Sequence, residues 1–256
     1  MKRFIFKIAV IFIFLAGKFT IDCTLLLAAP ENNLPVLNFI KPSGTPAETA
    51  TTLQILIGLT ILSLAPSILI MMTSFIRIII VLSFVRNGLG MQQVPPNQVL
   101  IGLALFITFF IMAPVFSDIN KNAVVPYLNQ QISTGEAIKR AEKPLRDFMF
   151  KQTREKDLAL FLHYAKLQKQ VNSLDDVPTY VLIPSFIISE LKTAFQMGFI
   201  IFLPFLVIDM IVASTLMSMG MLMLPPIMIS LPFKILLFVM VDGWDLVIKS
   251  LIAGFH

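Results

Sequence analysis

The clearest pattern along the chain is an alternation of long apolar segments with polar ones. Apolar residues dominate 51–117 and 185–256, and about half of the acidic and basic residues lie between them, in 118–184. A helix of about 20 apolar residues is long enough to span a bilayer. The pattern therefore predicts an all-α membrane protein, in which two apolar helical hairpins interrupted by prolines flank a polar helical insert.

The first hairpin, within 51–117, is expected from two apolar segments, Leu53–Ile76 and Val99–Phe116. Between them, NGLGMQQVPPNQ (87–98) has the glycines and paired prolines of a turn. Arg77 and Arg86 precede this turn without an acidic neighbour, so the positive-inside rule predicts a cytoplasmic tip. We interpret Arg77 first as an anchor that sets this topology, and second as a member of a structural or inter-subunit ion pair.

The insert, 118–184, is predicted to contain two water-exposed helices on the non-cytoplasmic side. Ser133 and the glutamate three residues later form a capping box, which predicts a helix that stops at Pro144. A second helix is predicted over 154–170. Its apolar residues recur at helical spacing and should share one buried face: Leu158, Phe161, Leu162 and Ala165.

The second hairpin, within 185–256, contains a Met-rich loop and a C-terminal segment. Residues 210–233 carry no charge, yet Gly220, Pro225 and Pro226 are residues that end or begin helices. Because methionine is the most adaptable apolar side chain, this combination predicts a deformable constriction where two broken helices meet. The alternative is that methionine only replaces leucine in a buried or lipid-facing helix. The alternating methionines are Met217, Met219, Met221 and Met223.

Charged residues within or beside the second hairpin's apolar runs need a partner. A charge in hydrocarbon costs at least a few kcal/mol, so such residues usually face protein or water. We expect Glu190 and Lys234 to form an ion pair, within the chain or between copies; the alternative is that each reaches the lipid headgroups separately. Asp209 has no titratable neighbours that would form a proton relay, so that role is the less favoured one.

Residues 1–29 have the pattern of a secretory signal peptide. A positive start is followed by a short apolar core, Ile8–Ala16, and small residues precede Pro30. Residues 30–50 are predicted to be an extended polar linker. The alternative to a cleaved signal is an uncleaved anchor.

Composition excludes several classes of function. Hydrophobic residues make up 57% of the 256 and charged residues only 14%, whereas soluble domains are about one-quarter charged. The net charge of +5 is scattered along the chain, which argues against nucleic-acid binding. The single cysteine, Cys23, and two isolated histidines do not predict a metal site. Phosphate-binding, nucleophile-elbow and zinc motifs are absent from the sequence, so we expect neither an enzyme nor a cofactor.

Two blocks, 71–116 and 185–244, resemble the FliP family of flagellar biosynthetic proteins. The resemblance rests on the motifs VPPNQ, MSMGM, LPP, PFK and VDGW, in the family's order and spacing. It implies a core subunit of the flagellar type III export gate in the inner membrane at the flagellar basal body. It also implies a homopentamer joined to FliQ and FliR, next to FlhA and FlhB, that conducts unfolded flagellar proteins. In such an assembly the Met-rich stretch would be the gasket of the resting channel, and the apolar hairpins would contact lipid or other subunits.

Three other functions stay open at this point. The first is the injectisome counterpart, a type III secretion subunit that exports virulence proteins. The second is a secondary transporter for a small solute, with a coupling ion near Asp209. The third is a membrane-bound scaffold without a pore.

Overall fold

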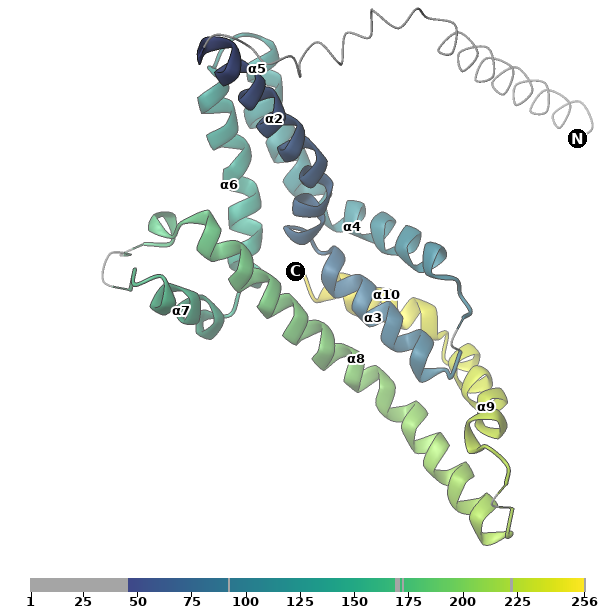
Figure 1. Ribbon diagram of the computed structural model, residues 1–256. Coiled ribbons are helices and arrows are strands. Elements are labelled where there is room, and N and C mark those ends of the chain that lie inside the picture. Colours follow the sequence, from purple (N-terminus) through teal and green to yellow (C-terminus); the bar gives the residue numbers. More distant parts are fainter. Residues whose placement is uncertain (1–45, 92, 169–170, 172, 222, 256) are drawn as a thin grey trace, which may run out of the picture. The chain divides into compact units, whose positions relative to one another are not determined.

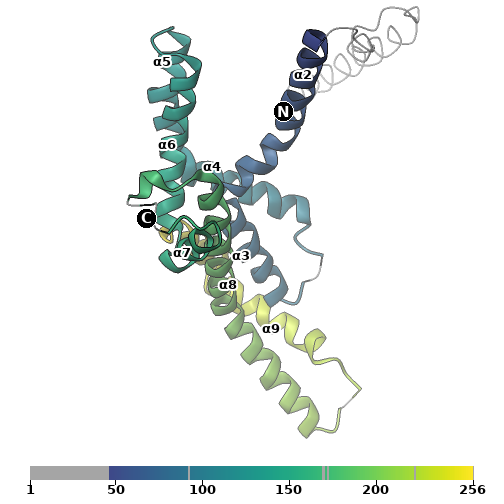
Figure 2. The same cartoon turned by 60° about the vertical axis from the view of Figure 1, so that its left-hand side comes forward.

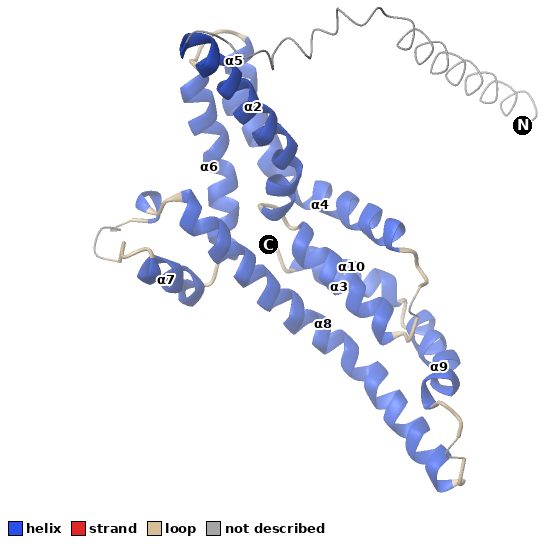
Figure 3. Cartoon of the chain, in the orientation of Figure 1, coloured by secondary structure: helices blue, strands red, loops and turns tan. Residues whose placement is uncertain are grey.

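The computed structural model describes residues 46–91, 93–168, 171, 173–221 and 223–255. These residues form helices joined by turns, with no strand among them, so the all-α prediction is confirmed for the described part of the chain (Figure 3). The signal peptide predicted for 1–29 and most of the linker predicted for 30–50 lie outside the described residues.

Figure 1 shows the helices in chain order. They are α2 (Pro46–Met71), α3 (Phe75–Gly88), α4 (Asn97–Ile119), the π-helical η2 (Asn120–Val124), α5 (Val125–Leu128), α6 (Thr134–Gln152), α7 (Glu155–Tyr164), the 3₁₀ turn η3 (Leu174–Asp176), α8 (Thr179–Ser218), α9 (Pro226–Met240) and α10 (Gly243–Ala253).

The chain divides into two compact units, Met1–Ser63 and Leu64–His256, with the boundary inside α2. In the first unit, the described residues belong to α2, and its large apolar side chains are exposed, among them Leu53, Leu59 and Leu62. The last five residues of the predicted linker, 46–50, are helical here rather than extended. Ala-Glu-Thr-Ala after a proline is a good helix start, because proline at the first position has no N–H to leave unpaired.

In the second unit, α3 is the central helix of the larger hydrophobic core. Its buried residues are spaced by three or four, so they form one stripe: Ile78, Val81, Leu82 and Val85. Helices α4, α8, α9 and α10, together with Leu89 directly after α3, supply the other buried members of this core, and α3 lies alongside α8 in both views (Figures 1 and 2). The predicted apolar segment 53–76 is divided between two helices, α2 and α3. Thr73 and Ser74 separate α2 from α3, because the Thr73 hydroxyl donates to the Ile70 carbonyl at 2.9 Å and completes a turn.

A second hydrophobic core joins the polar insert to the start of α8. Met112 of α4 packs with Phe148 and Met149 of α6 and with Leu182 and Phe186 of α8. The face predicted for the second insert helix packs against this core, with Leu158, Phe161, Leu162 and Ala165 all contributing. That helix is shorter than predicted, however, because α7 ends at Tyr164 and the chain turns at Lys166 with φ +59°.

The prolines interrupt the hydrogen bonding of these helices without ending them. Helix α6 continues through Pro144 to Gln152, so the predicted stop at Pro144 is wrong. Helix α8 likewise runs through Pro184 and Pro204 for 40 residues. A proline removes one backbone hydrogen bond, but the α6 residues that follow Pro144 are held by the second core, so the helix persists.

Within the part of the chain that the structure describes, two helical stretches are long and apolar enough to cross a membrane, judged by length and composition. They are Asn97–Leu128, which runs through α4, η2 and α5, and Thr179–Ser218, which is α8. At 1.5 Å per residue α8 is about 60 Å long, twice the roughly 30 Å of bilayer hydrocarbon. Its first half is the part that carries the insert, through the second core and through contacts with α6 and α7.

Candidate functional site

The loop between α8 and α9, residues 219–225, is built by a glycine at one end and two prolines at the other. Gly220 has φ +75°, a conformation that favours glycine. Its N–H donates to the Met217 carbonyl and the Met221 N–H donates to the Leu216 carbonyl, both at 3.0 Å. This pair of bonds is a Schellman motif, which ends a helix and satisfies its last carbonyls.

Helix α9 begins where the two prolines stand. Pro225 has the extended backbone of an N-cap (φ −69°, ψ 116°), and Pro226 is the first helical residue. Proline suits this position because its fixed φ is already helical. Gly220, Pro225 and Pro226 therefore lie at the two ends of the loop, where α8 ends and α9 begins.

We call residues 217–225, the end of α8 and the loop that follows it, the Met loop, and its four methionine side chains are largely uncovered by their own chain. The exposed fractions are 59% for Met217, 70% for Met219, 45% for Met221 and 97% for Met223. Figures 1 and 2 show the loop at the end of α8 opposite to the end that α6 and α7 contact. A cluster of exposed thioethers on an uncharged loop requires a lipid or protein environment to cover it.

The turn between α3 and α4 repeats this construction. Gly90 has φ +77°, its N–H donates to the Asn87 carbonyl at 3.0 Å, and the Met91 N–H donates to the Arg86 carbonyl at 3.3 Å. Residues 90–96 and 220–226 share Gly, Met and Pro-Pro at identical spacing. The repeat was not predicted from the sequence, although aligning the two turns residue by residue reveals it.

Arg77 is buried and forms a two-pronged ion pair with Glu190. The Nε–H of Arg77 donates to Glu190 Oε2 at 2.9 Å, and Nη2 donates to Glu190 Oε1. Arg77 is 2% exposed and Glu190 is fully buried. The structure therefore favours the second interpretation of Arg77, a structural ion pair, over the topological anchor, because the side chain is buried and paired within the chain.

Lys234 of α9 pairs with Asp209 of α8. Lys234 Nζ lies 2.6 Å from Asp209 Oδ2, and the Ser230 hydroxyl donates to Asp209 Oδ1 at 2.5 Å. The predicted Glu190–Lys234 pair is wrong within the chain. Glu190 lies 19 residues before Asp209 on α8, about 28 Å along a helix, so it is far from the carboxylate that Lys234 reaches. A pair between copies stays a prediction.

The turn between α3 and α4 lies beside the ion pair of Lys234 and Asp209. A pocket of about 280 Å³ is lined by Gly90 and Met91 of the turn and by Asp209, Ile227 and Lys234 of α8 and α9. A side chain in place of the Gly90 hydrogen would lie 3.8 Å from Lys234 Nζ. The turn thus covers the buried ammonium group, which helps to explain why it is only 2% exposed.

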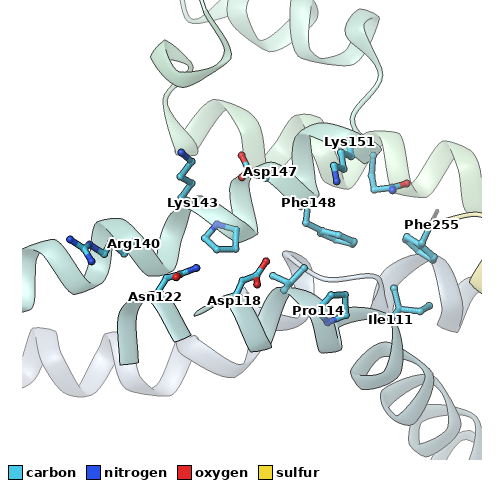
Figure 4. A pocket seen from close by; sticks show the side chains of 13 residues that line it. Ile111, Pro114, Asp118, Asn122, Arg140, Lys143, Asp147, Phe148, Lys151 and Phe255 are labelled. Atoms are coloured by element: carbon cyan, nitrogen blue, oxygen red, sulfur yellow. The ribbon is translucent and has the colours of Figure 1, made fainter. Parts of the chain in front are cut away.

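A pocket of about 680 Å³ lies between α4 with η2 on one side and α6 on the other, with Phe255 at one end (Figure 4). Asp118 and Asn122 project toward α6, and Phe148 and Phe255 form an aromatic wall. The pocket has neither a nucleophile next to a base nor a phosphate-binding turn. Among the described residues, no group of three His, Cys, Asp or Glu could hold a metal ion.

Comparison with known proteins gives one consistent result. The model of the FliP family matches residues 58–251. Flagellar biosynthetic protein FliP of Bacillus subtilis (strain 168) is 62% identical over 216 residues, which cover 84% of this chain and 97% of that protein. FliP of Pectobacterium carotovorum is 53% identical over 84% of this chain and 83% of its own length. FliP of Treponema pallidum is 51% identical over 88% of this chain and 84% of its own length.

Proposed function

Because the chain belongs to the FliP family of flagellar biosynthetic proteins, we propose that it is a pore-forming core subunit of the flagellar export gate. It is a non-enzymatic membrane protein of the flagellar export apparatus. The proposal adds that several copies, five as expected for the family, join FliQ and FliR next to FlhA and FlhB. Unfolded flagellar proteins then cross the inner membrane through the channel that the copies surround.

The observation that carries this proposal is the exposed Met loop. Four methionines lie at one end of the α8–α9 pair, and the loop that contains them has no charged residue. In a single copy they face solvent or lipid. Around a shared axis, the same loops from neighbouring copies would pack against one another and cover the thioethers. We propose that Met217, Met219, Met221 and Met223 form the seal of the resting channel in this way.

The physical properties of methionine fit such a seal. A channel for unfolded chains must accept side chains of any size, yet exclude ions when no chain is inside. A narrow apolar ring excludes water and ions by dewetting. Methionine has three rotatable bonds and no branching, so its side chain can change shape around a passing peptide. A ring of leucine or valine would seal but would yield less readily.

The ends of the loop would allow this movement without disturbing the helices. Gly220 ends α8 with its own hydrogen bonds, and α9 starts independently at Pro226. Movement can therefore be confined to 219–225 while the ion pair between Asp209 and Lys234 holds the two helices together. We propose that Gly220, Pro225 and Pro226 act as hinge residues of the gate.

Topology completes the proposal. Residues 1–29 would be a signal peptide, 30–50 a linker, and the insert 118–184 would lie on the non-cytoplasmic side between the two apolar hairpins. The first half of α8, which carries the insert, would then lie outside the hydrocarbon. The later half, about 20 residues, is about 30 Å long, which matches the thickness of the hydrocarbon.

Ion permeability tests the seal. Replacing all four loop methionines by Ala should leave the complex assembled but let ions leak, because four short side chains cannot close the ring. Potassium efflux from cells reports the leak, and native gel electrophoresis reports assembly. The matched control replaces Met210, Met228 and Met240, which are exposed on α8 and α9 outside the loop. Unchanged permeability in the loop variant, with assembly intact, would refute the gasket role.

The alternatives make different predictions. The related proteins above are named as flagellar, which favours the flagellar system over the injectisome. A solute transporter would need Asp209 free to bind a coupling ion, but this carboxylate is already paired with Lys234 and Ser230. A scaffold without a pore would tolerate the loss of the methionines without any leak.

A further inference from the structure

Arg77 contacts three elements besides its own helix. In addition to the ion pair with Glu190 of α8, Nη2 donates to Gln152 Oε1 at the end of α6 at 2.9 Å. Nη1 donates to the carbonyl of Gly254, directly after α10, at 2.8 Å. The guanidinium carbon also lies 3.8 Å from the centre of the Phe255 ring, which is a cation–π contact. Each nitrogen of this buried side chain thus has a partner, and the partners come from α6, α8 and the end of α10.

The end of α10 lies between the two hydrophobic cores. Phe255 packs against both, and its ring stacks on Phe148 of the insert at 6.2 Å between centres. Leu251 buries the last turn of α10 in the larger core, and the bond from Arg77 to the Gly254 carbonyl and the packing of the Phe255 ring hold the two residues that follow the helix.

The other end of α10 is joined tightly to α9. Asp242 has φ +51° and turns the chain back, and Gly243 lies under the ring of Phe238. The Trp244 ring meets the Phe238 ring edge to face at 5.4 Å. A displacement at the Arg77 end of α10 would therefore be passed to α9, and α9 begins at the Met loop.

A buried ion pair is weak evidence for stability. Desolvating two charges costs several kcal/mol each, and replacing such a pair by apolar side chains of similar size is often neutral or stabilising. Its better supported use is to select one arrangement of helices over others. The fork of Arg77 suits this use, because lysine could not serve Glu190, Gln152 and Gly254 in fixed directions.

We propose that Arg77 is a positioning residue of the export gate. It fixes the end of α10 against the insert and α8, and through α10 it sets where α9 and the Met loop lie. Gate assembly depends on this placement and not on the stability that the ion pair supplies. The dependence of gate assembly on this placement rests on the proposed function. The placement of α10 by Arg77 does not, because it is a property of the single chain.

The test compares the Arg77→Met/Glu190→Met double variant of the full chain with the parent. Spin labels on cysteines at Lys151 and Ala253, both exposed, report the distance between the end of α6 and the end of α10. Cys23 is replaced by Ser in all versions. The double variant should keep its thermal midpoint within about 3 °C of the parent, broaden the distance distribution and lose the assembled complex. Arg77→Lys, which keeps the charge, should broaden the distribution too.

A control variant and two contrary results complete the test. The Glu136→Met/Arg140→Met variant removes an exposed pair on α6 and should leave both the distance distribution and assembly unchanged. A double Arg77/Glu190 variant with a narrow, parent-like distribution overturns the proposal. So does a fall of its thermal midpoint by more than about 10 °C, which would make the pair a stabilising one. The distance measurement does not involve the channel, so failure of the gasket role would not affect it.

Discussion

Gly198 of α8 allows α3 to approach closely, and replacing it by Ala tests how tightly the two helices are packed. A methyl group at this position would lie 2.4 Å from Phe84 Cδ2, about 1 Å closer than ordinary contact, and 3.0 Å from Phe84 Cβ. Since Cβ is attached to the backbone, rotating the ring cannot relieve the contact. The ring is also held edge to face against Phe195, with 5.5 Å between centres. Helix α3 itself must shift.

The size of the effect follows from two opposing contributions. Overpacking a well-packed core costs about 1–3 kcal/mol. Alanine in a helix interior is favoured over glycine by about 0.8–1.0 kcal/mol. The net destabilisation is therefore about 0–2 kcal/mol relative to the parent, which for a chain of this size lowers the thermal midpoint by up to about 8 °C.

Thermal unfolding in detergent, followed by circular dichroism, measures this shift. Gly102→Ala in α4 is the matched control, because nothing lies within 4 Å of its added methyl group. That variant should be as stable as the parent or more stable by up to about 1 kcal/mol. If Gly198→Ala unfolds at the same temperature as Gly102→Ala, the close packing of α3 on α8 described above is wrong.

Three further predictions concern the charged side chains. Asp157→Asn should weaken the packing of α7 on α8 by about 1–3 kcal/mol, because Ser189 and Lys192 lose the carboxylate that they contact. Faster hydrogen exchange in α7 would report this weakening, and an unchanged exchange rate would count against the prediction. Burial raises the pKa of Asp157, but the hydrogen bonds from Lys192 and Ser189 and the nearby positive charges outweigh burial and hold the pKa below its ordinary 3.8. Because the folded pKa is the lower one, this stabilisation is present above about pH 4 and is lost as the pH falls through the folded value; melting curves should show this loss in the parent and not in Asp157→Asn. Asp209→Asn leaves Lys234 buried without its counter-charge and should cost about 3 kcal/mol, and adding Lys234→Met should recover most of the lost thermal stability; a double variant as unstable as the single one would argue against the pair.

The parts of the fold that depend on local periodicity could be predicted from the sequence. The apolar face of α7, from Leu158 to Ala165, is spaced as a helix requires, and it packs where expected. The break between α2 and α3 falls within the predicted apolar segment 53–76, and it also has a local signal. Thr73 and Ser74 stand between two apolar runs, and both residue types are favoured at helix starts.

Prolines led the predictions astray where tertiary packing held a helix together. Pro144 and Pro204 both lie inside helices, although each removes a backbone hydrogen bond. The sequence marks where a helix is weakened, but it does not show which neighbouring residues will hold it. Pro226 was easier to interpret, because a proline at the first helical position costs nothing.

Partners of buried charges depend on the tertiary fold and could not be assigned from the sequence. Arg77 and Glu190 are 113 residues apart, and neither position indicates the other. The sequence did show that Glu190, Asp209 and Lys234 each need a partner, because charges in apolar runs are costly. Choosing between Arg77 and Lys234 as the partner of Glu190 required the spatial arrangement of α3, α8 and α9, which carry these three residues.

The central claim is that Met loops from neighbouring copies meet around one channel. Cysteine cross-linking measures this directly, with a single cysteine in place of Met223, which is 97% exposed in the single chain, or in place of Phe106 on α4, which is 78% exposed. In assembled complexes, a short bis-maleimide should join copies through position 223 and not through position 106. Cysteines at 223 that remain unlinked and instead react with a lipid-soluble maleimide would place the loop against lipid and contradict the account.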